Sequence, residues 1–224
     1  AAVLAPYSGA LGRGVLVVAL GAHLLIAALS ARALMRLPLN ERRMTGAWHL
    51  TFVGFIIAPI AAVPLGWDGL ALVIQLLSLA MAIVVWGGCA LMLARAPVTR
   101  ELRPTLVIHL SPVCLFGIAA ALLGHETIAL IFGWSSVALA AVLLLRVRYL
   151  VADGFGHGWG AFTFPIAAFT NLMLLLSPAQ GAPFRAFAAL ALIFASVSIV
   201  VIATRIVAMW FNGSLAVQSG VARA

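Results

Sequence analysis

The stretch GWGAFTFPIAAFTNLML (158–174) is apolar over nearly its whole length, yet it carries a proline, Pro165, near its middle. Two phenylalanines, Phe162 and Phe164, stand just before that proline. Apolar runs of about twenty residues are typical of transmembrane helices. A proline inside a helix removes a backbone hydrogen bond and frees a carbonyl one turn back, and in a membrane that group needs protein or water around it. The stretch therefore predicts a kinked membrane helix.

The composition of the whole chain agrees with a membrane location. Of its 224 residues 65% are hydrophobic and 8% are charged, with a mean hydropathy of +1.22. No soluble domain of this length needs so much apolar surface, so we predict an integral membrane protein. The net charge of +8 comes from arginines that mostly lie between the apolar runs, which indicates topology and not nucleic-acid binding. Cys89 and Cys114 fall inside apolar runs, where they are expected to pack as small apolar residues.

The apolar runs and the arginines together predict an all-α, multi-pass protein. The connections alternate between arginine-rich segments and short segments without a basic residue. The positive-inside rule places the arginine-rich connections and the C-terminus in the cytoplasm, which in a cell-envelope context means the inner (plasma) membrane. The predicted full spans number seven, at roughly 14–31, 47–66, 70–94, 105–124, 127–145, 159–178 and 184–204.

Prolines occur only in alternate spans. Pro59, Pro112 and Pro165 are spaced 53 residues apart, and one further step back is Pro6. Equal spacing indicates an internal repeat of helical hairpins within a single transmembrane domain, 1–224. If the 53-residue repeat extends back to Pro6, residues 1–11 are expected to be the remnant of a preceding proline helix, followed by a turn at Gly12-Arg13-Gly14. The repeat then predicts that the chain is N-terminally truncated. The alternative is that the prolines are ordinary kinks, but their confinement to alternate spans favours a shared role.

The ionisable residues argue against an enzyme, a metal site or a bound cofactor. No Walker A, nucleophile-elbow or HExxH motif is present, and without lysine a retinal Schiff base is impossible. Haem ligation by His23 and His109 is disfavoured because their helices lack matching partners. The run GFGHGWG (154–160) is better explained as a flexible loop than as a nucleotide site. All the carboxylates lie in loops or at span ends, at Glu41, Asp68, Glu101, Glu126 and Asp153.

What remains is a transmembrane pathway without fixed charge. Broken helices can point backbone N–H groups at such a pathway, which favours anions, and the arginine-rich loops would raise the local anion concentration. Phe164 and Phe162 are candidates for an apolar plug, although both rings could instead pack against neighbouring helices. Candidate pore-lining residues near the prolines are Phe55, His109 and Thr163, and for His109 packing or hydrogen bonding is the alternative.

Three segments resemble the tellurite-resistance/C4-dicarboxylate transporter (TDT) family, which is related to the slow-type anion channel of plant guard cells. WGAFTFPIAAF (159–169) resembles the ninth helix of that family, and WHLTFVGFIIAPIAAVPLG (48–66) resembles the fifth. RAPVTRELRPTLVIHLSPV (95–113) resembles the link into the seventh helix. The similarity extends from about residue 12 to residue 211.

The resemblance implies ten helices in five hairpins around a central pore, usually in a homotrimer, with proline-kinked inner helices and one phenylalanine that occludes the pore. Phe164 matches that phenylalanine best, and Phe162 is second. The implied function is a channel or exporter for small anions in a lipid bilayer; the alternative is a secondary carrier for C4-dicarboxylates or tellurite- or sulfite-type oxyanions that works by alternating access. With seven full spans and a half helix, the chain lacks part of the expected ring of hairpins.

Overall fold

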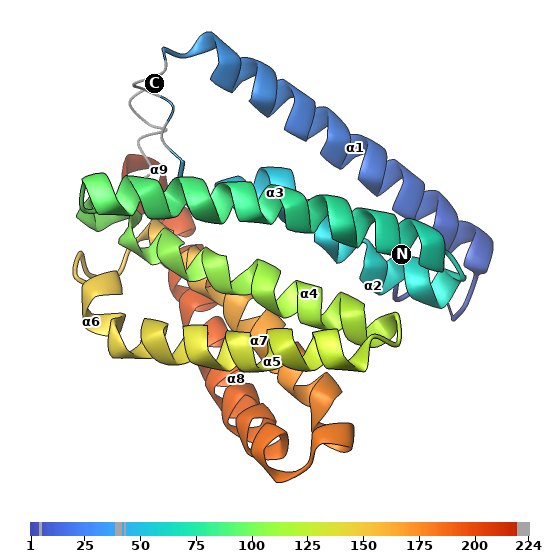
Figure 1. Cartoon of the computed structure of the whole chain (residues 1–224). Coiled ribbons are helices and arrows are strands. Elements are labelled where there is room, and N and C mark those ends of the chain that lie inside the picture. The colour runs from blue at the N-terminus through green and yellow to red at the C-terminus, as the bar shows by residue number, and fades with distance from the viewer. Residues whose placement is uncertain (5, 39–41, 43, 219–224) are drawn as a thin grey trace. The chain divides into compact units, whose positions relative to one another are not determined.

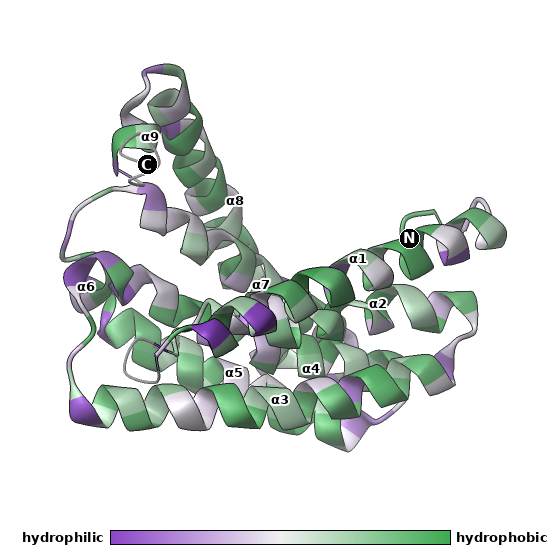
Figure 2. Cartoon of the chain, turned by 90° about the horizontal axis from the view of Figure 1, so that it is seen from above, coloured by the Kyte–Doolittle hydropathy of each residue, from purple (hydrophilic) through white to green (hydrophobic). Residues whose placement is uncertain are grey.

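The computed structural model describes residues 1–4, 6–38, 42 and 44–218, and these residues form helices and connections with no strand among them (Figure 1). Hydrophobic residues cover the helix bodies, while hydrophilic residues gather at helix ends and connections (Figure 2). The prediction of an all-α polytopic membrane protein is confirmed. Within the described part of the chain, six segments are long and apolar enough to cross a membrane: Gly9–Arg36, Asp68–Arg95, Arg100–Leu122, Glu126–Leu145, His157–Gln180 and Ala182–Phe211.

The chain divides into two compact units. Unit 1 comprises Ala1–Ala96 and Leu115–Phe132, and unit 2 comprises Pro97–Cys114 and Gly133–Ala224. Helices α4 (Leu110–Leu122) and α5 (Glu126–Leu145) each begin in one unit and end in the other.

Unit 1 is built around a broken helical segment that lies between two long helices. Its core joins side chains of α1, of the broken segment and of α3, among them Leu16, Ala62 and Ile74. Most of α1 is exposed within the unit, which suits a helix that faces lipid or further protein. The elements in order are α1 (Gly9–Arg36), the π-helix η1 (His49–Val53), the 3₁₀ helix η2 (Gly54–Ile57), α2 (Pro59–Ala62), the 3₁₀ helix η3 (Val63–Leu65) and α3 (Asp68–Arg95).

Unit 2 is organised by a long antiparallel hairpin of α7 and α8 (Figure 1). The hydroxyl of Thr170 contacts both helices, because it lies 2.9 Å from the carbonyl oxygen of Ile166 in α7 and 3.2 Å from that of Ala191 in α8, and its one proton is shared between the two acceptors. The 3₁₀ helix η4 packs along α7. The elements in order are η4 (Arg100–His109), α6 (Val147–Leu150), the 3₁₀ turn η5 (His157–Trp159), α7 (Gly160–Gln180), α8 (Ala182–Phe211) and α9 (Ser214–Gln218).

Each of the three spaced prolines has a 3₁₀ stretch on its N-terminal side, namely η2, η4 and η5. Pro59 explains why such a stretch is useful. It has no N–H to offer to the carbonyl of Phe55, and the N–H of Ala58 donates to that carbonyl instead, at 2.9 Å. The tighter 3₁₀ pairing thus satisfies a carbonyl that the proline would leave open.

The short connections close on glycines in the left-handed conformation. Gly66 and Gly124 have φ angles of 75° and 76°. After them, the N–H of Trp67 donates to Ala62 and that of His125 donates to Ala120, which is the hydrogen bond of a Schellman helix end. A residue with a Cβ would be strained there, so these positions allow the tight hairpins that the sequence predicts.

Two predictions need correction. The turn predicted at Gly12-Arg13-Gly14 is wrong: these residues lie inside α1, which starts at Gly9 after an N-cap by the hydroxyl of Ser8. The span predicted at 47–66 is helical. Its helical pieces together cover His49–Leu65, which is shorter than each of the six candidate spans. Glu41, Arg43 and Arg223 lie outside the described residues.

Candidate functional site

Phe164 lies on α7 with its ring 40% exposed, while the next residue, Pro165, is fully buried. Successive residues of an α-helix differ in direction by about 100°. The proline therefore faces the interior of unit 2. The ring of Phe164 points about 100° away from that direction.

Phe162 has a different environment. Its ring centroid lies 5.6 Å from that of Trp159, one turn earlier, and Trp159 packs in turn on Phe155 at 5.0 Å. Two helical positions separate Phe162 from Phe164 by about 200°, so the two rings point to nearly opposite sides of α7. They cannot both close one pore, and the packed environment of Phe162 leaves Phe164 as the better candidate.

The other candidates in unit 2 lie close to these residues along η4, α4 and α7. The hydroxyl of Thr163 donates to the carbonyl of Gly160 within its own helix, at 2.8 Å. His109 is the last residue of η4 and is half-buried, and Pro112 is buried in the first turn of α4. Since η4 packs along α7, His109 and Phe164 belong to neighbouring elements.

Phe55 and Pro59 belong to unit 1. Pro59 is fully buried. The ring of Phe55 meets the imidazole of His23 edge to face, with centroids 4.3 Å apart. Nε2 of His23 lies 3.1 Å from the carbonyl oxygen of Thr51. A carbonyl only accepts hydrogen bonds, so Nε2 carries the proton in this contact.

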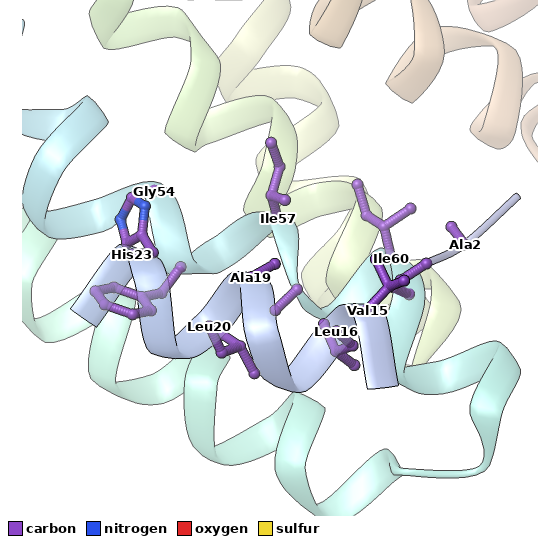
Figure 3. A pocket seen from close by; sticks show the side chains of 13 residues that line it. Ala2, Val15, Leu16, Ala19, Leu20, His23, Gly54, Ile57 and Ile60 are labelled. Atoms are coloured by element: carbon purple, nitrogen blue, oxygen red, sulfur yellow. The ribbon is translucent and has the colours of Figure 1, made fainter. Parts of the chain in front are cut away.

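A groove of about 340 Å³ runs between α1 and the segment 54–61. Figure 3 shows its two walls, with Leu16 and Leu20 on one side, Ile57 and Ile60 on the other, and His23 beside Gly54 at one end. Phe55 lines the groove and Pro59 does not. Apart from the imidazole the groove is apolar, so it can hold hydrocarbon but has no evident means to attract an anion.

The charged residues stay at the ends of the helices. Asp68 and Glu126 are the first residues of α3 and α5, Glu101 is in the first turn of η4, and Asp153 lies in a turn after α6. Across the described ranges, no three His, Cys, Asp or Glu side chains gather as metal ligands would. These four acids therefore lie at helix ends or in a turn, as predicted.

Gln75, the one glutamine of α3, is a buried polar residue that the motifs of the sequence do not include. It is 7% exposed, its amide nitrogen lies 3.5 Å from the carbonyl of Phe116, and its amide oxygen has no hydrogen-bond partner. An amide within an apolar run was the signal, because a buried polar group in a membrane helix usually has a packing or functional reason. Arg13, which was predicted in a turn, lies in α1, and its guanidinium donates to the carbonyl of Leu65 at 3.3 Å.

Apolar spans, prolines inside helices and acids at helix ends define a multi-pass helical membrane protein. The comparison with protein families makes this specific: the family model SLAC1, described as voltage-dependent anion channel, matches residues 2–210. The chain belongs to this family, which confirms the resemblance to the TDT group, and it is a transmembrane anion channel or transporter. No curated protein matched the chain in the corresponding search.

Proposed function

We propose that this protein carries small anions passively through a central, uncharged pore in the inner membrane, with Phe164 as the side chain that closes the pore. The observation that carries the proposal is the contrast on α7 between the buried Pro165 and the 40% exposed ring of Phe164. A proline-kinked helix that presents a large apolar ring away from its own packing partners has the form of a gate.

The chemistry of such a gate is steric and hydrophobic. An apolar ring in a narrow pore excludes hydrated ions because it leaves them no polar partner, and it favours dewetting of the constriction. Thr163, next to Phe164, has its hydroxyl bonded to its own helix, so it adds no strong ligand for an ion. Selection of anions then rests on the diffuse positive potential of the arginines and on the absence of carboxylates within the spans.

The remaining assignments complete the proposal. Pro59, Pro112 and Pro165 kink the pore-lining helices, and Phe55 and His109 contribute to the wall. The C-terminus is cytoplasmic, and the assembly is a homotrimer with one pore in each subunit. The resemblance of three proline segments to the inner helices of the TDT family supports this arrangement.

The test is Phe164→Ala in the full-length protein, reconstituted in planar bilayers or liposomes, with chloride flux as the readout. We expect at least a tenfold higher flux, because removal of the ring opens the constriction. Phe162→Ala is the matched control: it removes the same side chain from the same helix on nearly the opposite face, so it should lower stability and leave flux unchanged. Unchanged flux in Phe164→Ala, or a rise only in Phe162→Ala, would refute the gate assignment.

A second measurement separates a channel from a coupled carrier. Flux through an uncoupled pore follows the electrochemical gradient of the anion and does not need a proton gradient. Dissipating a pH gradient across the liposomes at constant membrane potential should therefore leave chloride flux in Phe164→Ala unchanged. Loss of flux under these conditions would favour alternating access over a channel.

A further inference from the structure

One end of unit 2 carries five arginines, which we call the basic end. They come from the start of η4, the junction of α5 and α6, and the last turns of α8, and η4 contacts both α6 and η5. Two carboxylates, Glu101 and Asp153, accompany them, so the end keeps a net positive charge. The five arginines are Arg100, Arg103, Arg146, Arg148 and Arg205.

Arg103 is held in a fixed orientation. Its guanidinium carbon lies 4.1 Å from the centroid of the Tyr149 ring, and its Nε donates to the carbonyl of Val98 at 3.3 Å. Stacking occupies the flat face of the guanidinium, and the bond to Val98 occupies one N–H at the edge. The two terminal nitrogens remain as donors, in the geometry that suits two oxygens of one phosphate group.

Arg205 has a platform of the same kind. Its guanidinium carbon lies 5.2 Å from the ring of Phe155, which belongs to the glycine-rich run 154–160. Within that run, Phe155 packs on Trp159, and the indole N–H of Trp159 donates to the carbonyl of Gly154 at 2.7 Å. The glycine-rich run, predicted as a flexible loop, is closed by this internal hydrogen bond and by the tilted contact of the two rings.

The two platforms lie on neighbouring elements. A Cβ at Gly158 would be 3.5 Å from the carbonyl oxygen of Glu101 and 3.5 Å from Cγ of Pro104, so the glycine-rich run rests directly on η4. The loop that carries Phe155 therefore adjoins the helix that carries Arg103. Arg146 and Arg148 both precede Tyr149 in the chain and are exposed.

We propose that the basic end is a binding site for a phosphate group, and that its source is the headgroup of an anionic membrane phospholipid. The positive-inside rule accounts for the sign of the charge but requires no oriented guanidinium. Two arginines placed over aromatic rings, next to a loop closed by an internal hydrogen bond, go beyond that rule. Phospholipid is favoured over soluble phosphate because the basic end terminates membrane spans and carries a tryptophan, as the headgroup level of a bilayer does.

The experiment measures lipid retention by native mass spectrometry of the full-length protein in detergent, with phosphatidylglycerol or phosphatidylcholine of the same acyl chains added. We expect selective retention of phosphatidylglycerol, and a loss of affinity of roughly fivefold for each of Arg103→Gln and Arg205→Gln. Arg185→Gln is the matched control, since this exposed arginine begins α8 at the opposite end of that helix, and it should change nothing.

Two further variants separate a shaped site from simple charge. Arg103→Lys keeps the charge but loses the pair of guanidinium nitrogens that can bind two phosphate oxygens. Tyr149→Leu keeps every arginine but removes the aromatic ring beneath Arg103. Both should weaken binding of phosphatidylglycerol at least threefold. Wild-type affinity in both variants, or an equal loss in Arg185→Gln, would overturn the proposal by showing that only net charge matters.

A competition arm distinguishes the two sources of phosphate. Inorganic phosphate at millimolar concentration should not displace phosphatidylglycerol, because it lacks the acyl chains that hold the lipid at the interface. Displacement by inorganic phosphate, at a chloride-matched ionic strength, would overturn the lipid assignment and identify a soluble phosphate site.

Discussion

The close contact between Gly54 and His23 makes Gly54→Ala an informative substitution in unit 1. A Cβ at position 54 would lie 2.8 Å from Cε1 and 3.1 Å from Nε2 of the imidazole. Non-bonded carbon atoms prefer about 3.5–4.0 Å, so the ring would have to retreat by roughly 0.7 Å or more. Such a displacement disturbs the bond from Nε2 to the carbonyl of Thr51, which is already 3.1 Å long.

Three terms set the expected loss of stability. Overpacking costs about 1–3 kcal/mol, and loss of a hydrogen bond costs about 0.5–1.5 kcal/mol. The helix preference of alanine over glycine offsets up to about 1 kcal/mol of this. We therefore expect Gly54→Ala to lower the free energy of unfolding by about 0.5–4.5 kcal/mol. In a His23→Ala background the clash is absent, and the same substitution should be neutral or stabilising.

The assay is a double-mutant cycle on the purified protein in detergent, followed by denaturant unfolding. The wild type, both single variants and the double variant give the coupling between positions 54 and 23, expected at about 1 kcal/mol or more. Gly21→Ala is the control, because nothing lies within 4 Å of a Cβ there. If Gly54→Ala destabilises equally with and without the imidazole, the contact with His23 is not the cause and the reasoning fails.

The remaining predictions also concern contacts within one unit. Gly88→Ala should lower the free energy of unfolding by about 1 kcal/mol or more, because its Cβ would collide with Sδ of Met44. Gly87→Ala, on the preceding residue, meets open space and should not, so equal unfolding midpoints of the two variants would contradict this. Thr170→Val should lower the free energy of unfolding by about 0.6 kcal/mol in the same assay, since it removes the hydroxyl contact between α7 and α8. Thr204→Val removes only bonds within its own helix and should have a smaller effect; the reverse order would show that the interhelical contact contributes nothing.

The positions of the helices could be read from the sequence because apolar length is what a bilayer demands. The short connections after the spans at 47–66 and 105–124 were also accessible, whereas their closure on Gly66 and Gly124 was not predicted. The start of α1 was not. The repeat drew attention to Pro6 and suggested a turn at 12–14, whereas Ser8 caps a helix that simply continues through two glycines, which membrane helices tolerate.

The candidate site was accessible only in part. The two phenylalanines before Pro165 were ranked by the family resemblance alone, although two helical steps already place them on nearly opposite faces. What separated them was the ring of Trp159, which packs on Phe162 and could not be assigned from the sequence. The stacking of Arg103 on Tyr149 joins residues 46 positions apart, and no local pattern announces such a contact.

The broken segment His49–Leu65 has a consequence for the surrounding lipid. The segment is 17 residues long and at the rise of an α-helix would extend about 25 Å, whereas the hydrocarbon core of a bilayer is about 30 Å thick. Tryptophans stand at both of its ends, Trp48 and Trp67, and would anchor it at the two water interfaces. In a thicker bilayer with longer acyl chains, the π-helical and 3₁₀ turns of this segment should therefore extend before its α-helical turn does. The conformation of the segment would then depend on the thickness of the membrane.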